Sequence, residues 1–130
     1  MRELVEKLSQ FSQPLQILVL CGDNKQLYED ISKLAVVSKN PVVVYGFVEN
    51  VDELMTVSDL AITKSGGLTV SEAMAKCLPL IVVSPIPGQE SKNAKLLIKV
   101  DAGWQARGLN DAMAIVKEVI VHPDILLKKR

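Results

Sequence analysis

The stretch that decides the fold is Ile62-Thr63-Lys64-Ser65-Gly66-Gly67-Leu68-Thr69-Val70-Ser71-Glu72-Ala73, because an apolar run stops at two glycines and a helical pattern follows at once. Adjacent glycines let the backbone approach a ligand without a Cβ in the way. The free N–H groups and the positive dipole end of a helix start favour an anion. We therefore predict a phosphate site at this turn, with the Glu72 carboxylate placed to accept hydrogen bonds from ribose hydroxyls.

A second interpretation of the same residues involves no ligand. Thr69 and Glu72 fit the S/T-x-x-E capping box, in which the glutamate turns back to cap its own helix. Their spacing alone leaves both interpretations open.

Composition limits the class of protein. The chain has 130 residues, 48% apolar content and a mean hydropathy of +0.24, which favour one packed domain at residues 1–130. Fifteen basic residues balance fifteen acidic ones, so the electrostatic footprint of a nucleic-acid binder is missing. No apolar run approaches the length of a membrane span.

The cysteines and the histidine offer little chemistry. Cys21 and Cys77 each lie in an apolar stretch without Cys-x-x-Cys spacing, so we expect buried, reduced thiols. His122 stands next to Pro123 and is expected in a surface turn. A single histidine leaves neither a His-based metal site nor a Ser-His or Cys-His nucleophile pair.

Short apolar runs alternate with helical patterns along the chain. Asn24 and Asn110 are placed to cap two of the helices. Strands that are apolar throughout and separated by amphipathic helices predict an α/β, doubly wound fold, with a mainly parallel sheet and helices on both faces. The strands are expected at 15–21, 41–47, 60–63 and 79–83, and a short segment is expected around 103–105. The helices are expected at 2–10, after 24, after 50, at 68–76, 90–99, after 110 and after 123.

The conspicuous turns all follow strands. In parallel sheets ligands bind at the carboxyl ends of the strands, so these loops should share one edge and form a site there. They are found at 22–24, 46–50, 65–67 and 85–90.

Three motifs carry a resemblance to a known family: ITKSGGLTVSEA at 62–73, LP at 78–79, and PIPGQE-x-x-N-A at 85–94. From about residue 15 to 106 the sequence resembles the donor-binding, Rossmann-like half of two-domain GT-B glycosyltransferases. The family in question contains the diacylglycerol glucosyl- and galactosyltransferases and the peptidoglycan N-acetylglucosaminyltransferase. The PGQE segment favours the glycolipid branch.

The resemblance implies a UDP-sugar laid across these loops. The uracil would lie near Phe47 and Val48, and Glu72 would hold the ribose hydroxyls. The resemblance implies no divalent metal, since the helix start would supply the positive charge. The diphosphate would be held by Ser65, Gly66, Gly67, Leu68 and Thr69, and the hexose hydroxyls by Gln89, Glu90 and Asn93.

The function implied by the resemblance is inverting transfer of a hexose to a lipid hydroxyl such as that of diacylglycerol. Enzymes of this kind belong to glycolipid biosynthesis and would be membrane-associated, peripheral on the cytoplasmic face. The family's first strand and glycine-rich turn do not precede residues 2–10. We therefore expect a donor-binding fragment, with the general base in an absent N-terminal domain and a strand edge open to dimerisation.

Three other functions stay open at this point. One is a noncatalytic nucleotide-sugar-binding subunit, a second is a UDP-sugar epimerase on the same two-domain fold, and a third is an α/β domain that binds some other phosphate ligand. The epimerase would need acid and base residues in the crevice, which the 85–90 loop does not obviously supply.

Overall fold

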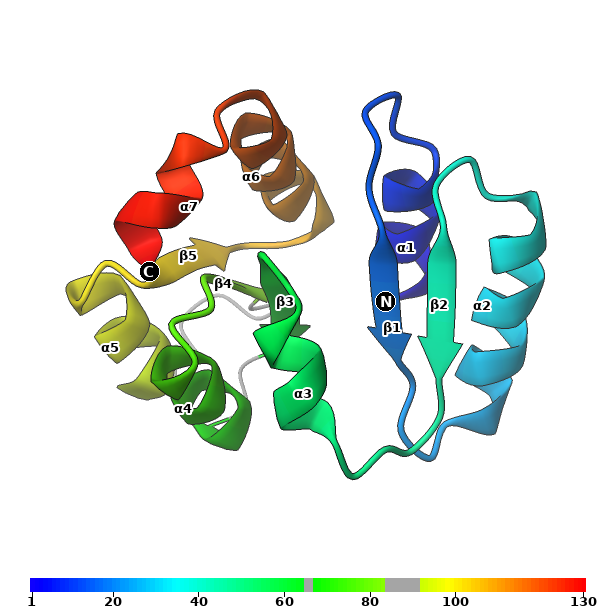
Figure 1. Ribbon diagram of the computed structural model, residues 1–130, viewed down its shortest axis with the longest axis horizontal. Helices are drawn as coiled ribbons and strands as arrows, with labels where there is room; N and C mark the ends of the chain where they lie inside the picture. The colour runs from blue at the N-terminus through cyan, green and yellow to red at the C-terminus, as the bar shows by residue number, and fades with distance from the viewer. Residues whose placement is uncertain (65–66, 84–91) are drawn as a thin grey trace. The chain divides into compact units, whose positions relative to one another are not determined.

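The structure, a computed structural model, describes residues 1–64, 67–83 and 92–130, without the side chains at 67, 68 and 93. Helices and parallel strands alternate along these residues (Figure 1), which confirms the predicted α/β class. The chain divides into two compact units, Met1–Val51 and Asp52–Arg130, which are described separately.

The first unit holds a two-stranded parallel sheet. Strands β1 and β2 pair with Ile17 opposite Val42 and Leu20 opposite Tyr45. Helices α1 and α2 contribute Val5 and Ile31 to the core that packs on this sheet. The elements are α1 (Arg2–Ser9), β1 (Ile17–Leu20), α2 (Lys25–Val37) and β2 (Val42–Tyr45).

Asn24 caps α2, as predicted. Its Oδ1 accepts a hydrogen bond from the Leu27 N–H at 3.0 Å. This satisfies one of the N–H groups that a helix start leaves without a partner, and it fixes where the helix begins.

The second unit holds a three-stranded parallel sheet in the order β3-β4-β5. All three strands point the same way, so Lys64, Val83 and Ala106 lie side by side at the carboxyl ends. The elements are α3 (Val51–Thr56), which starts at the last residue of the first unit, β3 (Ala61–Lys64), α4 (Gly67–Ala75), β4 (Leu80–Val83), α5 (Lys92–Lys99), β5 (Gly103–Ala106), α6 (Leu109–Val121) and α7 (Asp124–Lys129).

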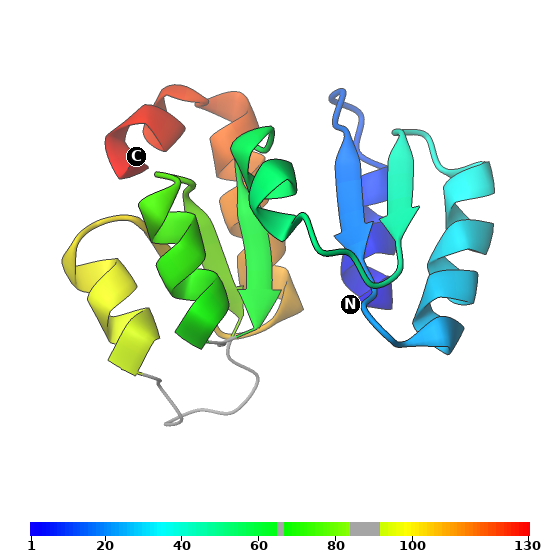
Figure 2. The same ribbon diagram turned by 60° about the horizontal axis from the view of Figure 1, so that its bottom comes forward.

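Both faces of this second sheet are covered. Leu80, Ile81 and Val82 are consecutive in β4 and all fully buried, although successive side chains point to opposite faces. Figures 1 and 2 show α4 and α5 on one side of the sheet and α6 on the other. In this unit the predicted helices on both faces are confirmed.

Helix α4 ends in a Schellman motif. The Leu78 N–H donates to the Ala73 carbonyl at 2.9 Å, and the Cys77 N–H donates to the Met74 carbonyl at 3.0 Å. Cys77 has φ +55°, the left-handed conformation that this motif requires. The cysteine therefore occupies a position that usually carries glycine.

Helix α5 ends in the same way. The Ala102 N–H donates to the Leu97 carbonyl at 3.0 Å, and the Asp101 N–H donates to the Ile98 carbonyl at 3.1 Å. Asp101 has φ +57° and takes the place that Cys77 has after α4. Both returns from helix to strand are thus built on one backbone geometry.

The start of α6 differs from the prediction. Gly108 is the N-cap and Asn110 lies inside the helix, so the prediction that Asn110 caps this helix was wrong. The Asp111 carboxylate instead accepts a hydrogen bond from the Arg107 N–H at 3.1 Å. The Asp111 carboxylate thus binds the backbone just before the helix, and the helix starts without an asparagine cap.

The carboxyl end agrees with the prediction. His122 is exposed and ends α6, and a short helix, α7, follows Pro123. Across the parts of the chain that the structure describes, none of the helices has both the length and the apolar character needed to cross a membrane.

Candidate functional site

The carboxyl edge of the second unit's sheet is where the predicted phosphate turn leaves β3. Lys64 ends β3, and α4 begins at Gly67. The register places the end of β3 beside Val83 and Ala106, so the segments after all three strands leave from one edge. In open parallel sheets this edge is the usual place for a ligand.

The amino end of α4 lies at this edge. The first N–H groups of a helix have no intrahelical acceptor, and they point along the axis toward whatever lies before the helix. Val70 and Ala73 are fully buried, which fixes α4 against the core of this unit. The helix start is therefore held on a rigid support.

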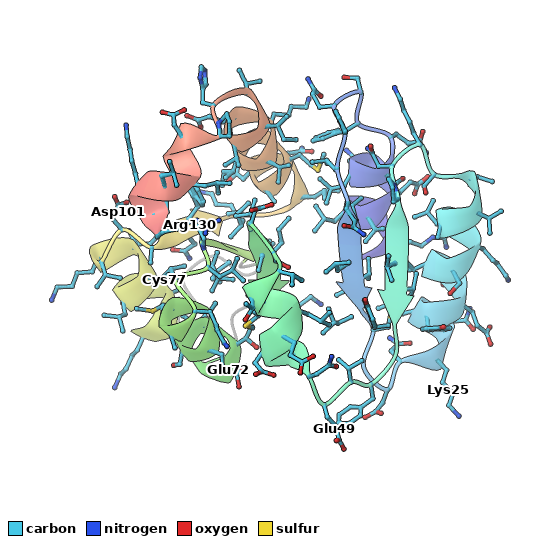
Figure 3. The ribbon with its side chains drawn as sticks, viewed as in Figure 1. Lys25, Glu49, Glu72, Cys77, Asp101 and Arg130 are labelled. Carbon is cyan, nitrogen blue, oxygen red and sulfur yellow. The ribbon has the colours of Figure 1, made fainter. Side chains whose placement is uncertain are left out.

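Thr69 is the third residue of α4 and does not cap it, so the capping-box interpretation, which needs Thr69 at the N-cap, was wrong. Glu72 follows one turn later, and its side chain is exposed (Figure 3). An exposed carboxylate one turn into the helix is available to a ligand at the helix start.

Several predicted site residues lie outside the described structure. For Gly67 and Leu68 the structure gives the backbone of the first turn of α4, and for Asn93 the backbone of the second residue of α5. The binding roles assigned to these residues stay predictions. Ser65, Gly66, Gln89 and Glu90 fall outside the described residues altogether.

The predicted uracil contacts lie in the first unit, directly after β2. The Phe47 side chain is 70% exposed, and Val48 is half-buried. An apolar residue at a strand end usually joins the core, and Phe47 does not. Its ring is therefore accessible, and the contact with a base stays a prediction.

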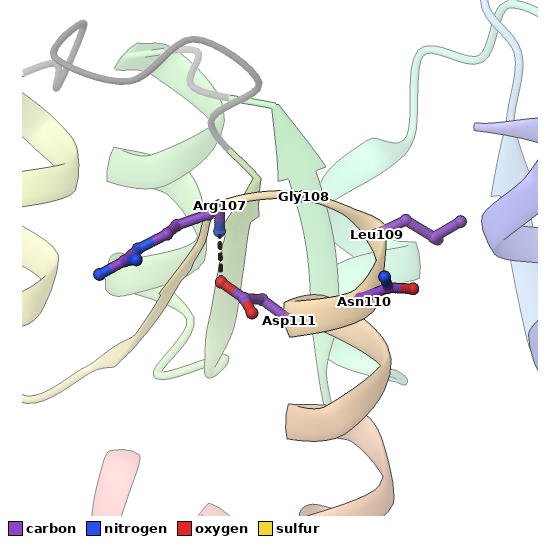
Figure 4. A pocket seen from close by; sticks show the side chains of 5 residues that line it. All are labelled: Arg107, Gly108, Leu109, Asn110 and Asp111. Atoms are coloured by element: carbon purple, nitrogen blue, oxygen red, sulfur yellow. Dashed lines mark hydrogen bonds between the residues drawn. The ribbon is translucent and has the colours of Figure 1, made fainter.

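A shallow hollow lies just beyond β5, and it was not predicted from the sequence. Its volume is about 410 Å³, and Figure 4 shows Arg107 and Asp111 at its wall, joined by the hydrogen bond to the Arg107 backbone. It opens at the same sheet edge as the start of α4. No ligand motif in the sequence marks these residues. Its lining residues are Arg107, Gly108, Leu109, Asn110 and Asp111.

The two cysteines differ from each other. Cys21 is buried in the core of the first unit, as predicted, and burial raises the pKa of its thiol. Cys77 is exposed, so the prediction of a buried thiol there was wrong. The left-handed turn after α4 points its side chain outward.

Among the described residues, no three His, Cys, Asp or Glu side chains are placed to hold a metal ion.

These features define a class of protein. A parallel α/β sheet whose carboxyl edge receives a helix start, with an exposed carboxylate one turn inside, has the architecture of nucleotide-binding α/β domains. The sequence profile of the glycosyltransferase family 28 C-terminal domain matches residues 1–120. The chain therefore belongs to this family, as the resemblance in the motifs indicated.

Curated relatives agree with this assignment. The chain is 49% identical over 115 residues to the processive diacylglycerol beta-glucosyltransferase of Bacillus cereus strain AH187. It is 45% identical over 113 residues to the protein of the same name in Bacillus thuringiensis strain Al Hakam, and 39% identical over 113 residues to that of Bacillus cereus strain G9842. Each match covers 87% of this chain and 29% of the relative, so the chain spans under a third of these relatives.

Proposed function

We propose that this chain is the donor-binding part of an inverting glycosyltransferase that moves glucose from UDP-glucose to a lipid hydroxyl, such as that of diacylglycerol. The observation that carries the proposal is membership of the glycosyltransferase family 28 C-terminal domain. The Bacillus relatives are named as diacylglycerol beta-glucosyltransferases, which supports both the hexose and the lipid acceptor.

The geometry at the carboxyl edge supports a donor bound across α4. The diphosphate would lie at the helix start beside Gly67, and the ribose hydroxyls would donate hydrogen bonds to Glu72. The assignment of the uracil to Phe47 and the backbone of Val48 rests on the family resemblance and not on this geometry. The hexose hydroxyls would meet Gln89, Glu90 and Asn93, since carboxylate and amide groups pair well with vicinal hydroxyls.

This arrangement suits the chemistry of transfer. Negative charge grows on UDP as the bond to the sugar breaks, and a helix start stabilises charge where it develops. The relatives are much longer than the matched part, and we propose that the general base for the acceptor hydroxyl comes from a region beyond it. The 130-residue chain alone would then bind the donor without transferring the sugar.

Two further properties belong to the proposal. Donor binding should proceed without a divalent metal, because the helix dipole and the backbone N–H groups neutralise the diphosphate. Addition of a chelator should therefore leave UDP affinity unchanged. The whole enzyme would work at the cytoplasmic face of a membrane as a peripheral protein, where its lipid acceptor lies.

The test is a calorimetric titration of the chain with UDP, UDP-glucose and ADP. UDP and UDP-glucose should bind more tightly than ADP. Glu72→Gln should weaken UDP binding about 10-fold or more, because two ribose hydroxyls lose a charged acceptor. Glu118→Gln is the matched control, since Glu118 is an exposed carboxylate on α6.

The control separates a specific role from a change in net charge. Equal loss of affinity in the two variants would contradict the assignment of Glu72. Equal affinity for ADP and UDP would contradict a uridine site. If the folded chain binds none of the three nucleotides, the proposed donor site is wrong for this chain.

A further inference from the structure

Helix α5 carries its positive charges on one face. Lys92, Lys95 and Lys99 are all exposed. At about 100° per residue these three positions fall within about 60° of the helix circumference. Ala94 and Leu97 are fully buried on the opposite side, which fixes the direction of the lysines toward solvent. The lysines therefore form a single stripe along the helix.

Aliphatic side chains flank the stripe on both sides. Leu96 is 45% exposed and Ile98 is 46% exposed, and the helical positions put them on either side of the lysines. Hydrophobic side chains left this accessible on a helix are candidates for contact with a partner. We call the surface made by Lys92, Lys95, Leu96, Ile98 and Lys99 the lysine face of α5.

Acidic residues do not offset this charge along the helix. The sequence from Lys92 to Val100 contains no aspartate or glutamate. The first acidic residue after the helix is Asp101, and its carboxylate is paired with the Lys129 ammonium. The nearest acidic side chain after the helix is thus paired with a residue of another element.

We propose that the lysine face of α5 docks on the anionic surface of a lipid bilayer. Lysine ammonium groups attract anionic headgroups, and their aliphatic stems, with Leu96 and Ile98, suit the boundary between headgroups and acyl chains. The choice of a bilayer over an acidic protein rests on the proposed function, in which the acceptor is a lipid. The diphosphate of the donor is proposed to bind at the start of α4, and Asn93, the residue of α5 proposed to meet the hexose, is not part of the lysine face.

The test measures binding of the chain to vesicles by flotation. One set of vesicles contains phosphatidylcholine alone, and the other contains equal parts of phosphatidylglycerol and phosphatidylcholine. The chain should bind only the second set, and 1 M salt should release it, because the Debye length there is about 3 Å. The triple variant Lys92→Gln/Lys95→Gln/Lys99→Gln should bind on the order of 100-fold more weakly, as expected from loss of three charges near an anionic surface.

A matched variant controls for net charge. Lys33, Lys39 and Lys117 are exposed lysines outside α5, and changing all three to glutamine removes the same charge. This control should retain most of the binding, and circular dichroism should show both triple variants folded. Equal weakening in the two triple variants would overturn the proposal, since it would show a response to net charge alone. Failure of the unmodified chain to bind anionic vesicles would also overturn it.

Two further measurements separate the possible outcomes. Binding to immobilised polyglutamate without binding to vesicles would assign the lysine face to an acidic protein and overturn the lipid assignment. UDP titration of the α5 triple variant should give the affinity of the unmodified chain. Vesicle binding without UDP binding would support the lysine face while contradicting the proposed donor site, so the two failures can be told apart.

Discussion

Lys129 and Asp101 form an ion pair that joins the last helix, α7, to the turn after α5. The Lys129 ammonium also lies over the ring of Trp104, with Nζ 4.9 Å from the ring centroid. The Lys129 side chain is 15% exposed and that of Asp101 is 70% exposed. One cation thus connects α7 to both the turn and the strand β5 that follows it. A second ion pair joins Arg130, the residue after α7, to Asp59, with Arg130 Nη2 3.5 Å from Asp59 Oδ1.

We expect a small coupling energy between Lys129 and Asp101. In a double-mutant cycle of Lys129→Met and Asp101→Asn, measured by urea unfolding, it should be about 0.2–1 kcal/mol, because an exposed carboxylate is well solvated. It should fall in 1 M salt. Trp104 is the single tryptophan, so Lys129→Met should also shift the fluorescence emission. An unchanged emission spectrum would contradict the contact between Lys129 and the ring.

We expect Cys77→Gly to stabilise the chain by about 1 kcal/mol, since the left-handed conformation at φ +55° costs an L-residue about that much. Asp101→Gly relieves the same strain at φ +57° but removes the ion pair with Lys129, so its net gain should be smaller. The midpoints of urea unfolding provide the comparison. A destabilised Cys77→Gly variant would contradict the assigned motif.

The two thiols should differ in reactivity. An aromatic disulfide reagent should label the exposed Cys77 quickly in the folded chain, and Cys77→Ser should remove this fast phase. Cys21 is buried and its pKa is raised by desolvation, so it should react only after unfolding. Fast labelling of both thiols in the folded chain would contradict the burial of Cys21.

The raised pKa of Cys21 also predicts how stability depends on pH. The folded pKa lies above the unfolded one, so this contribution is fully present below the unfolded pKa and is lost as pH rises through the folded pKa. Stability should therefore decline above about pH 8.5, near the ordinary pKa of cysteine. Cys21→Ala should show a shallower alkaline decline, and an equally steep one would assign the decline to other groups.

Gly103 should not tolerate a side chain. A Cβ at this position would lie 2.1 Å from the Leu80 carbonyl oxygen and 3.0 Å from Leu97 Cδ2, so the strands or α5 would have to move. We expect Gly103→Ala to destabilise the chain by about 3 kcal/mol or more. Gly108→Ala is the matched control, because a Cβ there meets nothing within 4 Å. Equal stability of the two variants would contradict the close approach.

The local elements followed from the sequence because each depends on neighbours along the chain. The apolar run before the glycine pair predicted the strand β3, the pattern after it predicted the helix α4, and Asn24 predicted the start of α2. The prediction for Asn110 was wrong because another residue, Asp111, secures the start of α6. When two polar residues near a helix start can both accept a hydrogen bond from its backbone N–H groups, the local pattern does not decide which of them does so.

For the candidate site, the sequence predicted the helix start at α4 and the carboxylate at Glu72. It did not predict the hollow beside Arg107 and Asp111, because no ligand motif marks those residues. Cys77 was expected in the core because its neighbours are apolar. Its exposure follows from the left-handed turn that ends α4, and hydropathy carries no information about that turn.

The sequence by itself determined the α/β class, the strand and helix on either side of the glycine pair, and the family to which the chain belongs, since all three are properties of short, ordered segments. Only the tertiary structure decided which distant groups meet. Asn40 is buried and donates to the carbonyls of Leu8 and Phe11, and Lys129 reaches Asp101 across 28 residues. Such contacts depend on how helices pack against sheets. Packing depends on the whole set of buried side chains, so no single stretch of sequence specifies it.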